Sequence, residues 1–457
     1  MKHCFITTLF PRRQAPVAVL MAGAGLAFLL VAAGTSAGAP SGGADAVQSR
    51  LLTLEQALSI AAEKNRDIQK AREFIAWAQG KYVEERAAAL PQLTAVGSVA
   101  RDRDESQKIY SPMQTERTDR RLAQITLTQP LFTWGQVSAA IRAAKAGLKS
   151  ADEQLRLYRQ AAQRDVSAAF YDVLLARELH ALALHNLDQK QRHLEEAKRK
   201  YLAGVATDYD VLAAMVSVDN ARPEAIRTEN QIRTARERLR FLLALPEEVD
   251  AEGSLEAVPG PVGSFGELFA QARQRRPELA DLRHRIAISR EQVLLADAQD
   301  KPRVDLKGAY GWSYLEQPAI YGDGASWSVG VQLSYPFFDG LRATGKVTQA
   351  KSDLKRLELD EAKQTDSVAL ETRNAINAVG ESQEILRALA GTVSQAERLL
   401  VMAERGFALG VKTRLEVDDA ELNLREARSS LSRARRDYLV ARVNLDWVTG
   451  ILGEKEK

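Results

Sequence analysis

An internal duplication is the feature that most constrains the fold of this chain. The motif Gln-Pro-Leu-Phe-Thr-Trp-Gly at 129–135 is echoed by Tyr-Pro-Phe-Phe-Asp-Gly at 335–340, about 206 residues later. Such a spacing is far longer than the roughly 20–50 residues of a solenoid repeat. Residues 247–263, between the copies, are rich in proline and glycine and predict a linker. The sequence therefore predicts two copies of one half-unit, at residues 51–246 and 264–457.

The first residues carry the pattern of an export signal. Three bases, Lys2, Arg12 and Arg13, precede an apolar stretch at 15–33, and small residues follow it. We expect residues 1–39 to be a secretory signal peptide, cleaved after Ala37 or Ala39. A single N-terminal anchor helix is the alternative, because the apolar stretch is near the lower spanning length.

Composition supports the reading of an exported chain without a lipid anchor. The only cysteine, Cys4, precedes the apolar stretch, so no cysteine lies where a lipid would be attached. The three bases before residue 37 account for the whole formal net charge of +3, because 63 Lys and Arg otherwise balance 60 Asp and Glu. We expect residues 40–50 to be a linker to the first half-unit, and the mature chain to be neutral.

Period-two alternation predicts strands suited to a membrane. Beyond residue 39 no run of 18 apolar residues occurs, so the mature chain could enter a bilayer only as strands closed into a barrel. Residues 304–312 and 327–335 alternate apolar and polar, residues 123–128 do so in the first copy, and residues 93–101 are a weaker candidate. Their length matches the roughly 9–11 residues of a tilted membrane strand, and aromatic residues crowd the region. A half-buried soluble sheet rich in aromatic residues is the alternative.

Long proline-free segments predict helices packed side by side. Residues 136–203 and 341–409 contain no proline, and as single helices each would span roughly 100 Å. Residues 54–89 predict a further helix that ends before a proline. Apolar residues recur at intervals of seven in places, which indicates coiled-coil-like packing. Pro223 is expected to kink or break the helix that follows residue 204.

The expected strands force several copies of the chain to assemble. Two strands from each half-unit give four per chain, and small single-chain membrane barrels have at least about eight strands. Two chains would give eight strands and an interior filled by side chains, whereas three would give twelve strands and room for a conduit.

The duplicated helix-strand-strand-helix plan resembles the TolC-type outer membrane efflux proteins. The motifs that carry the resemblance are Pro-Phe-Phe-Asp-Gly at 336–340 and Phe407-x-x-Gly410-x-x-Thr413-x-x-x-Val417. The resemblance implies a mainly α chain with a membrane β-barrel portion: a homotrimer with a twelve-stranded barrel in the outer membrane and a periplasmic α-helical coiled-coil tunnel. It also implies a passive exit duct, for efflux or type I secretion, fed by an inner-membrane transporter of RND or ABC type through a periplasmic adaptor.

The resemblance also assigns candidate site residues. Tunnel-entrance acids fall on Glu416 and Asp419, a basic gate residue on Lys412, and its latch partner on Asp210. The inter-helix turns fall on Gly204 and Gly410, and the strand-to-helix turns on Pro130, Gly135, Pro336, Asp339 and Gly340. The alternative for the acids is helix capping, because Thr413 with Glu416 and Thr207 with Asp210 have the spacing of a capping box.

Other chemistry has little support in the sequence. The three histidines His180, His185 and His193 do not share one helix face, so we expect no metal site. No phosphate-binding loop or nucleophile-and-base arrangement occurs, so we expect no cofactor, no nucleic-acid partner and no enzymatic activity. The alternative function is a periplasmic coiled-coil adaptor or scaffold. The cargo, whether drug, metal, small molecule or protein, is set by the transporter.

Overall fold

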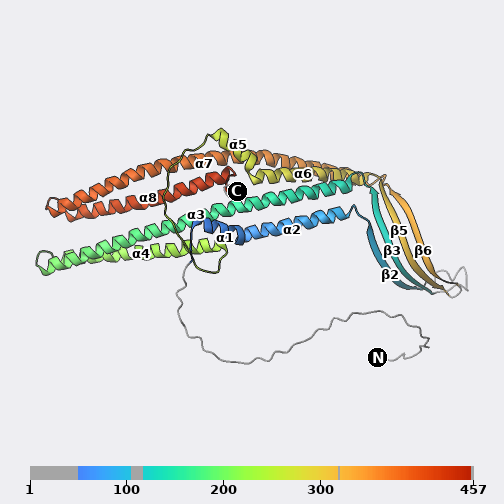
Figure 1. Cartoon of the computed structure of the whole chain (residues 1–457), viewed down its shortest axis with the longest axis horizontal. Coiled ribbons are helices and arrows are strands. Elements are labelled where there is room, and N and C mark those ends of the chain that lie inside the picture. Colours follow the sequence, from blue (N-terminus) through green and yellow to red (C-terminus); the bar gives the residue numbers. More distant parts are fainter. Residues whose placement is uncertain (1–49, 104–116, 318–319, 454–457) are drawn as a thin grey trace, which may run out of the picture. The chain divides into compact units, whose positions relative to one another are not determined.

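The structure, a computed structural model, describes residues 50–103, 117–317 and 320–453. These residues belong to the unit Gln48–Lys457, and the expected signal peptide at 1–39 lies outside them. The first half-unit contains α1 (Leu54–Lys64), α2 (Arg66–Ala87), β2 (Gln92–Asp102), β3 (Thr118–Phe132), α3 (Gln136–Leu202) and α4 (Asp208–Leu243). The second contains α5 (Phe265–Arg275), α6 (Pro277–Asp297), the short 3-10 helix η2 (Ala298–Asp300), β5 (Arg303–Gln317), β6 (Ile320–Ser334), α7 (Arg342–Ala408) and α8 (Arg414–Val448). The predicted order of elements is therefore present in both halves (Figure 1).

The helices form a layer in which each long helix has two successive neighbours from its own half. Helix α3 packs against α2 and then α4, and α7 packs against α6 and then α8. The two halves meet where α3 packs against α6 and α8 (Figure 1). Across the layer the order is thus α2 and α4, then α3, then α6 and α8, then α7. Within the described residues, no helix carries a stretch long and apolar enough to cross a membrane.

The four long strands form one antiparallel sheet in the order β2-β3-β5-β6. Strands β3, β5 and β6 have 15 residues each and β2 has 11, which is longer than the common five or six of soluble sheets. Both β2 and β6 are edge strands. The sheet therefore presents an unpaired edge on each half of the chain.

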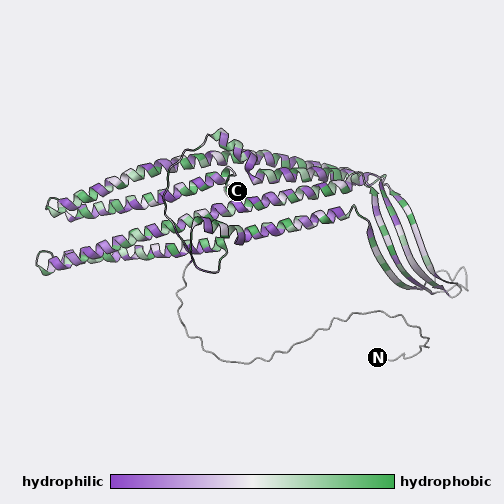
Figure 2. Cartoon of the chain, in the orientation of Figure 1, coloured by the Kyte–Doolittle hydropathy of each residue, from purple (hydrophilic) through white to green (hydrophobic). Residues whose placement is uncertain are grey.

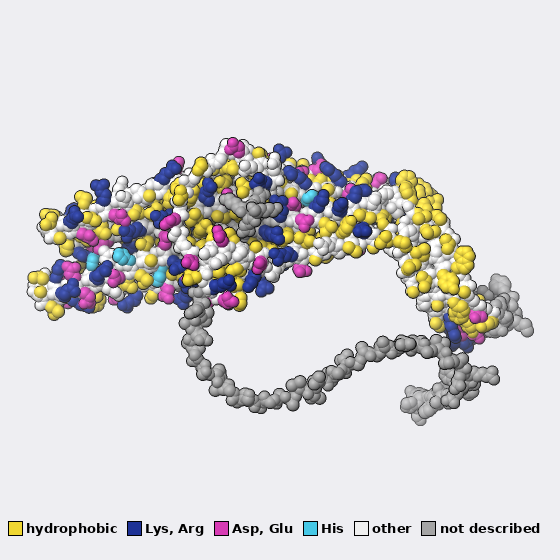
Figure 3. All heavy atoms as spheres, in the orientation of Figure 1, with side chains coloured by type: hydrophobic (Ala, Val, Ile, Leu, Met, Phe, Trp, Pro, Cys, Tyr) yellow, Lys and Arg dark blue, Asp and Glu magenta, His cyan; other side chains and the backbone are white. Residues whose placement is uncertain are grey.

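The register gives the sheet one apolar face. Residues opposite each other in an antiparallel pair share a face, and Ala95, Ile125, Tyr310 and Trp327 form one such row. Hydrophobic and hydrophilic residues alternate along the strands in Figure 2, and hydrophobic side chains gather over the sheet in Figure 3. Trp327 is 76% exposed and Val329 69%, so no described part of the chain covers these side chains. The opposite face is built mainly from Ser, Thr, Gln and Gly.

The first helix differs from its prediction. Instead of one helix over 54–89, the chain forms α1 and α2, with a break at Asn65. The Asn65 side chain accepts hydrogen bonds from the Asp67 and Ile68 amides and donates one to the Leu242 carbonyl. Asparagine thus caps the second helix while anchoring the break to α4. In the second half-unit the same break falls at Arg276, before Pro277 at the first turn of α6.

Of the kink or break expected at Pro223, a break does not occur. Helix α4 continues from Asp208 to Leu243 through the proline. Pro223 is exposed, so the carbonyl that its missing N–H leaves unpaired can bond to water. Ala221 and Ala225 are buried on the other side of the helix, and their packing holds it together.

The linker between the halves is more structured than its composition predicts. Strand β4 (Val249–Ala251) pairs in parallel with β1 (Arg50–Leu52), and both join a core of α1, α3 and α4 side chains. Further along, the Gly260 amide donates to the Tyr438 hydroxyl, which donates to the Val258 carbonyl. The linker is therefore bound to both halves.

A close approach between β3 and β5 yields a prediction for the sheet. A Cβ added at Gly311 would lie 2.6 Å from the Ala123 carbonyl oxygen, whereas one at Gly330 would meet nothing within 4 Å. We expect Gly311→Ala to lower the stability of the sheet by about 1–3 kcal/mol, because backbone must move to admit the methyl group. The thermal midpoint of tryptophan fluorescence in detergent measures it, since Trp312 and Trp327 lie on the sheet. Gly330→Ala is the control, and an equal midpoint for the two variants would contradict the expectation.

Candidate functional site

The candidate site lies at the ends of the helices that are remote from the sheet. Two turns join the helices there, one after α3 and one after α7 (Figure 1). Gly204 and Gly410 have φ of +74° and +73°, the left-handed conformation that glycine adopts without strain. The amides that follow, of Val205 and Val411, donate back to carbonyls of the preceding helix. Both predicted inter-helix turns are therefore helix-ending turns of one kind.

In the first half-unit the turn leads into a capping box. The Thr207 hydroxyl accepts from the Asp210 amide, and the Asp210 carboxylate accepts from the Thr207 amide at 2.8 Å. The hydrogen bonds from Thr207 hold the pKa of Asp210 below its ordinary value. The carboxylate of this latch candidate is thus engaged within its own turn.

In the second half-unit the same box forms with an added ion pair. Glu416 accepts from the Thr413 amide at 2.8 Å, and Lys412 donates to the same carboxylate. Hydrogen bonds from Lys412 and from the Thr413 backbone lower the pKa of Glu416. The capping alternative for Glu416 is therefore present in the structure, and Lys412 neutralises much of its charge.

The predicted latch between Lys412 and Asp210 does not form within the described residues. We call the two turns after α3 and α7, with the first helical turns that follow them, the tips. Lys412 pairs with Glu416 and Asp210 with Thr207, and the described residues show no contact between Lys412 and Asp210. Asp419 is exposed, and in the described part of the chain its carboxylate has no hydrogen bond or ion pair. Of the two candidate acids, Asp419 is thus the one whose charge no described residue compensates.

The strand-to-helix turns use one capping scheme with two different side chains. The Asp339 carboxylate accepts from the Ala343 amide at 2.8 Å, and the Thr133 hydroxyl accepts from the Val137 amide at 3.3 Å. Positive φ values follow in both turns, at Gly135 and at Gly340. Threonine thus replaces aspartate in the same role.

The two prolines predicted in the strand-to-helix turns differ in position, because Pro130 is part of a strand and Pro336 is not. Pro130 lies within β3, where the register shifts between Pro130 and Phe132, rather than in the turn where it was expected. A β-bulge accommodates the missing N–H of a proline in an interior strand. Pro336 lies beyond the end of β6, between the strand and α7.

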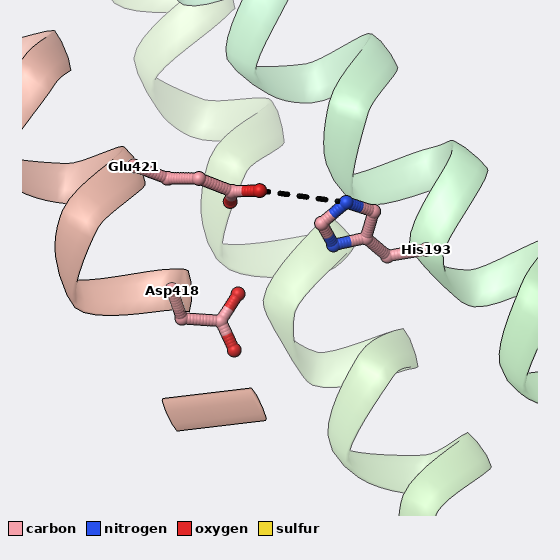
Figure 4. Close-up of side chains that lie close together, drawn as sticks. All are labelled: His193, Asp418 and Glu421. Atoms are coloured by element: carbon pink, nitrogen blue, oxygen red, sulfur yellow. Dashed lines mark ion pairs between the residues drawn. The ribbon is translucent and has the colours of Figure 1, made fainter. Parts of the chain in front are cut away.

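A charged cluster joins the two half-units close to the tips. Lys190 on α3 donates to Asp418 and Glu421 on α8, each at 3.0 Å. Figure 4 shows His193 beside the same two acids, with its Nε2 atom 3.5 Å from a Glu421 oxygen. Arg414 completes the cluster through contacts to His193 at 3.1 Å and to Asp418 at 3.3 Å. We call these five residues the seam cluster.

The seam cluster is buried enough for its pairing to matter. The Glu421 side chain is 6% exposed and that of Lys190 17%. Burial acts to raise the pKa of Asp418, but the hydrogen bond and charge of Lys190, together with Arg414, lower it below the ordinary value. Two bases thus compensate two acids, and His193 adds a titratable ring.

His193, Asp418 and Glu421 also have the ligand types of a metal site. Their donor atoms lie within 4.8 Å of one another. Lys190 and Arg414 already occupy the carboxylates, so an ion would have to displace them. His180 instead contacts Thr228 on α4 at 3.0 Å. Spacing along one helix was therefore the wrong criterion for these histidines, because the partners of His193 come from the other half of the chain.

Comparison with known proteins follows the same division into two halves. The family described as outer membrane efflux protein matches residues 57–245 and 268–451. Alkaline protease secretion protein AprF of Pseudomonas aeruginosa is 27% identical over 381 residues, covering 81% of this chain and 79% of that protein. Outer membrane protein TolC of Vibrio cholerae is 25% identical over 382 residues, covering 81% and 84%. The solved Campylobacter jejuni CmeC outer membrane channel superposes with a TM-score of 0.77 at 14% identity, covering 88% of this chain and 87% of that one.

The seam cluster yields a prediction about the contact between α3 and α8. We expect Lys190→Met to lower the free energy of opening this contact by about 2–3 kcal/mol, because Glu421 would stay buried without its donor. Hydrogen exchange of the α8 amides around residue 421 measures the opening. Lys190→Met combined with Glu421→Leu should regain most of the loss.

Lys198→Met is the matched control for this prediction. Lys198 lies on the same helix and pairs with Glu195 at 2.9 Å, with both side chains exposed. Exposed pairs contribute about 0–1 kcal/mol, so this variant should change exchange little. Equal effects of Lys190→Met and Lys198→Met would show that the seam cluster does not hold the halves together.

Proposed function

This chain belongs to the outer membrane efflux protein family, and we propose that it forms the passive exit duct of a tripartite efflux or type I secretion system. Its location is the outer membrane of a Gram-negative cell, with the helices in the periplasm. Cargo would be delivered by an inner-membrane transporter through a periplasmic adaptor. The duct itself would supply a path rather than a reaction.

One observation carries the proposal: the sheet and the helix layer end on the same two sides of the chain, because the edge strands and the outermost helices follow each other in the sequence. The sheet order β2-β3-β5-β6 leaves β2 and β6 unpaired. The helix layer likewise ends with α2 and α4 on one side and α7 on the other. Because α2 leads into β2 and β6 leads into α7, one rotation about a common axis would close both layers with further copies.

A lipid surrounding would require the two edges of the sheet to be paired. An apolar face with exposed Trp327, Val329 and Val331 fits lipid, and unpaired backbone groups at a sheet edge are costly in hydrocarbon. A soluble scaffold or adaptor, the alternative function, would leave this face without cover in water. Pairing β6 of one copy with β2 of the next satisfies both edges.

Three copies fit the polar face of the sheet better than two. An eight-stranded barrel has an interior filled by packed side chains, whereas twelve strands leave room for water. The polar face carries Ser, Thr, Gln and several glycines, which are suited to a wet wall and poorly suited to a packed core. We therefore propose a homotrimer with a twelve-stranded barrel continued by a helical tunnel.

At the tunnel entrance the structure separates the two candidate acids. The carboxylate of Glu416 caps α8 and pairs with Lys412, so it would contribute little to the field in the lumen. Asp419 is exposed and without a partner in the described residues, so a ring of three would keep its charge. We propose Asp419 as the main source of a cation-favouring constriction. We also propose that the seam cluster, rather than Lys412 with Asp210, holds the α3–α4 pair of helices against the α7–α8 pair.

Disulfide cross-linking tests the closure. We expect cysteines at Thr94 on β2 and at one of Ser326, Ser328 or Ser334 on β6 to link neighbouring copies into covalent dimers and trimers on denaturing gels. Within one chain β2 and β6 are three strand spacings apart, about 14 Å, which a disulfide cannot bridge. The only natural cysteine is Cys4, in the expected signal peptide, so the mature chain would carry only the two introduced cysteines. Ladders that stop at the dimer would contradict a trimer, and no linkage from any pair would contradict the closed barrel.

Planar-bilayer recording tests the entrance. We expect Asp419→Ala to raise conductance and to reduce block by multivalent cations several-fold, because a ring of three charges is lost. Glu416→Gln should change both less. Asp208→Ala, at an exposed acid in the first half-unit's tip, is the control for loss of charge. Unchanged current and block in Asp419→Ala would refute the constriction.

A further inference from the structure

The polar face of the sheet carries one charge that the structure leaves uncompensated. In the described parts of β2, β3, β5 and β6, the charged residues on this face are Asp102, Arg120, Arg303, Asp305 and Lys307. Arg120 pairs with Asp102 at 3.5 Å, and Arg303 donates to both oxygens of Asp305 at 2.9 and 3.0 Å. Lys307 is exposed and has no hydrogen bond or ion pair to any described residue.

The register explains why Lys307 stays without a partner. It lies opposite Thr128 on β3 and Gly330 on β6, so neither cross-strand neighbour offers a carboxylate. A Cβ added at Gly330 would meet nothing within 4 Å, so there is open space beside the lysine. The nearest acid along its own strand, Asp305, already binds Arg303. Water is therefore the remaining partner for the ammonium group.

We propose that Lys307 forms a ring of positive charge on the pore wall that favours anions in the barrel section of the duct. The inference rests on the proposed function, because the ring exists only if three copies close the sheet with its polar face inward. Lys307 lies four residues from the start of β5, about 13 Å along the strand from the helical end of the sheet. The ring would thus lie close to the passage from tunnel to barrel.

Pore size decides whether three lysines can affect passing ions. Twelve strands spaced about 4.8 Å apart and tilted about 40° give a wall radius of about 12 Å. A lysine side chain extends about 6 Å from the backbone, so its charge would lie within the Debye length of about 8 Å from the axis at physiological salt. Screening therefore leaves part of its field at the axis, whereas the fields of the two ion pairs, Arg303 with Asp305 and Arg120 with Asp102, largely cancel.

Reversal potentials in planar bilayers under a tenfold KCl gradient test the ring. We expect Lys307→Gln to raise the permeability of potassium relative to chloride about two- to threefold, and Lys307→Glu to raise it further. Lys307→Arg should keep the selectivity of the unaltered channel. Arg121→Gln is the matched control, because it removes one positive charge per chain from the opposite face of the same sheet, where Arg121 lies over the Tyr314 ring.

A second measurement asks directly whether position 307 faces the pore. In Lys307→Cys channels, a cationic methanethiosulfonate reagent should restore the original selectivity, and an anionic one should shift it toward potassium. If Lys307→Gln and Lys307→Glu conduct normally with unchanged selectivity, the ring is refuted while the duct stands. If the unaltered protein forms no channels, the duct itself is refuted, and the ring with it.

Discussion

The unpaired edges of the sheet are the constraint on which the rest of the molecule depends. Strands β2 and β6 leave backbone donors and acceptors without partners, on a sheet whose apolar face fits hydrocarbon. Water cannot satisfy those groups in a bilayer, which is the reason for our proposal that further copies of the chain pair with both edges. The helix layer ends on the same sides, and the duplication explains why: each half-unit supplies one edge and one interior strand, and the interior strands β3 and β5 pair with each other.

Different forces hold the two kinds of helix contact. Within each half-unit, α3 with α4 and α7 with α8 bury small and aliphatic side chains such as Ala183, Val218, Ala403 and Val417. Charged contacts are prominent between α3 and α8, which belong to different halves: Lys190 binds two acids close to the turns, and farther along α8 Arg436 pairs with Asp172 on α3. Hydrogen-bonded ion pairs require a specific donor and acceptor geometry, whereas burial of apolar surface is non-directional. The contact between α3 and α8 thus depends more on side-chain geometry than the contacts within each half do, whereas β3 and β5 join the halves through backbone hydrogen bonds.

The sequence could predict what depends on local periodicity. Proline-free stretches placed α3 and α7 within one or two residues. Alternation over 304–312 and 327–335 identified β5 and β6 but missed the last five residues of β5 and the first seven of β6. It could not predict what depends on tertiary partners. Asn65 ends α1 because its amide binds Leu242 far along the chain, β4 exists because β1 pairs with it, and His193 meets Asp418 and Glu421 only after the halves pack. The capping role of Glu416 was predictable from spacing, since a capping box is local.

The charge of the proposed conduit depends on the few unpaired charged residues rather than on the total numbers of acids and bases. Acids and bases are nearly equal in number, and many of those described are paired: Arg303 with Asp305 on the sheet, Lys412 with Glu416 at the tip. A paired charge has a field that falls off quickly, so it contributes little at the centre of a water-filled tube. Two residues without a charged partner among the described residues are Asp419, near the start of α8, and Lys307, near the start of β5. In the proposed trimer, a nearly neutral chain would therefore present acids at the entrance, Asp419 among them, and a positive charge from Lys307 in the barrel.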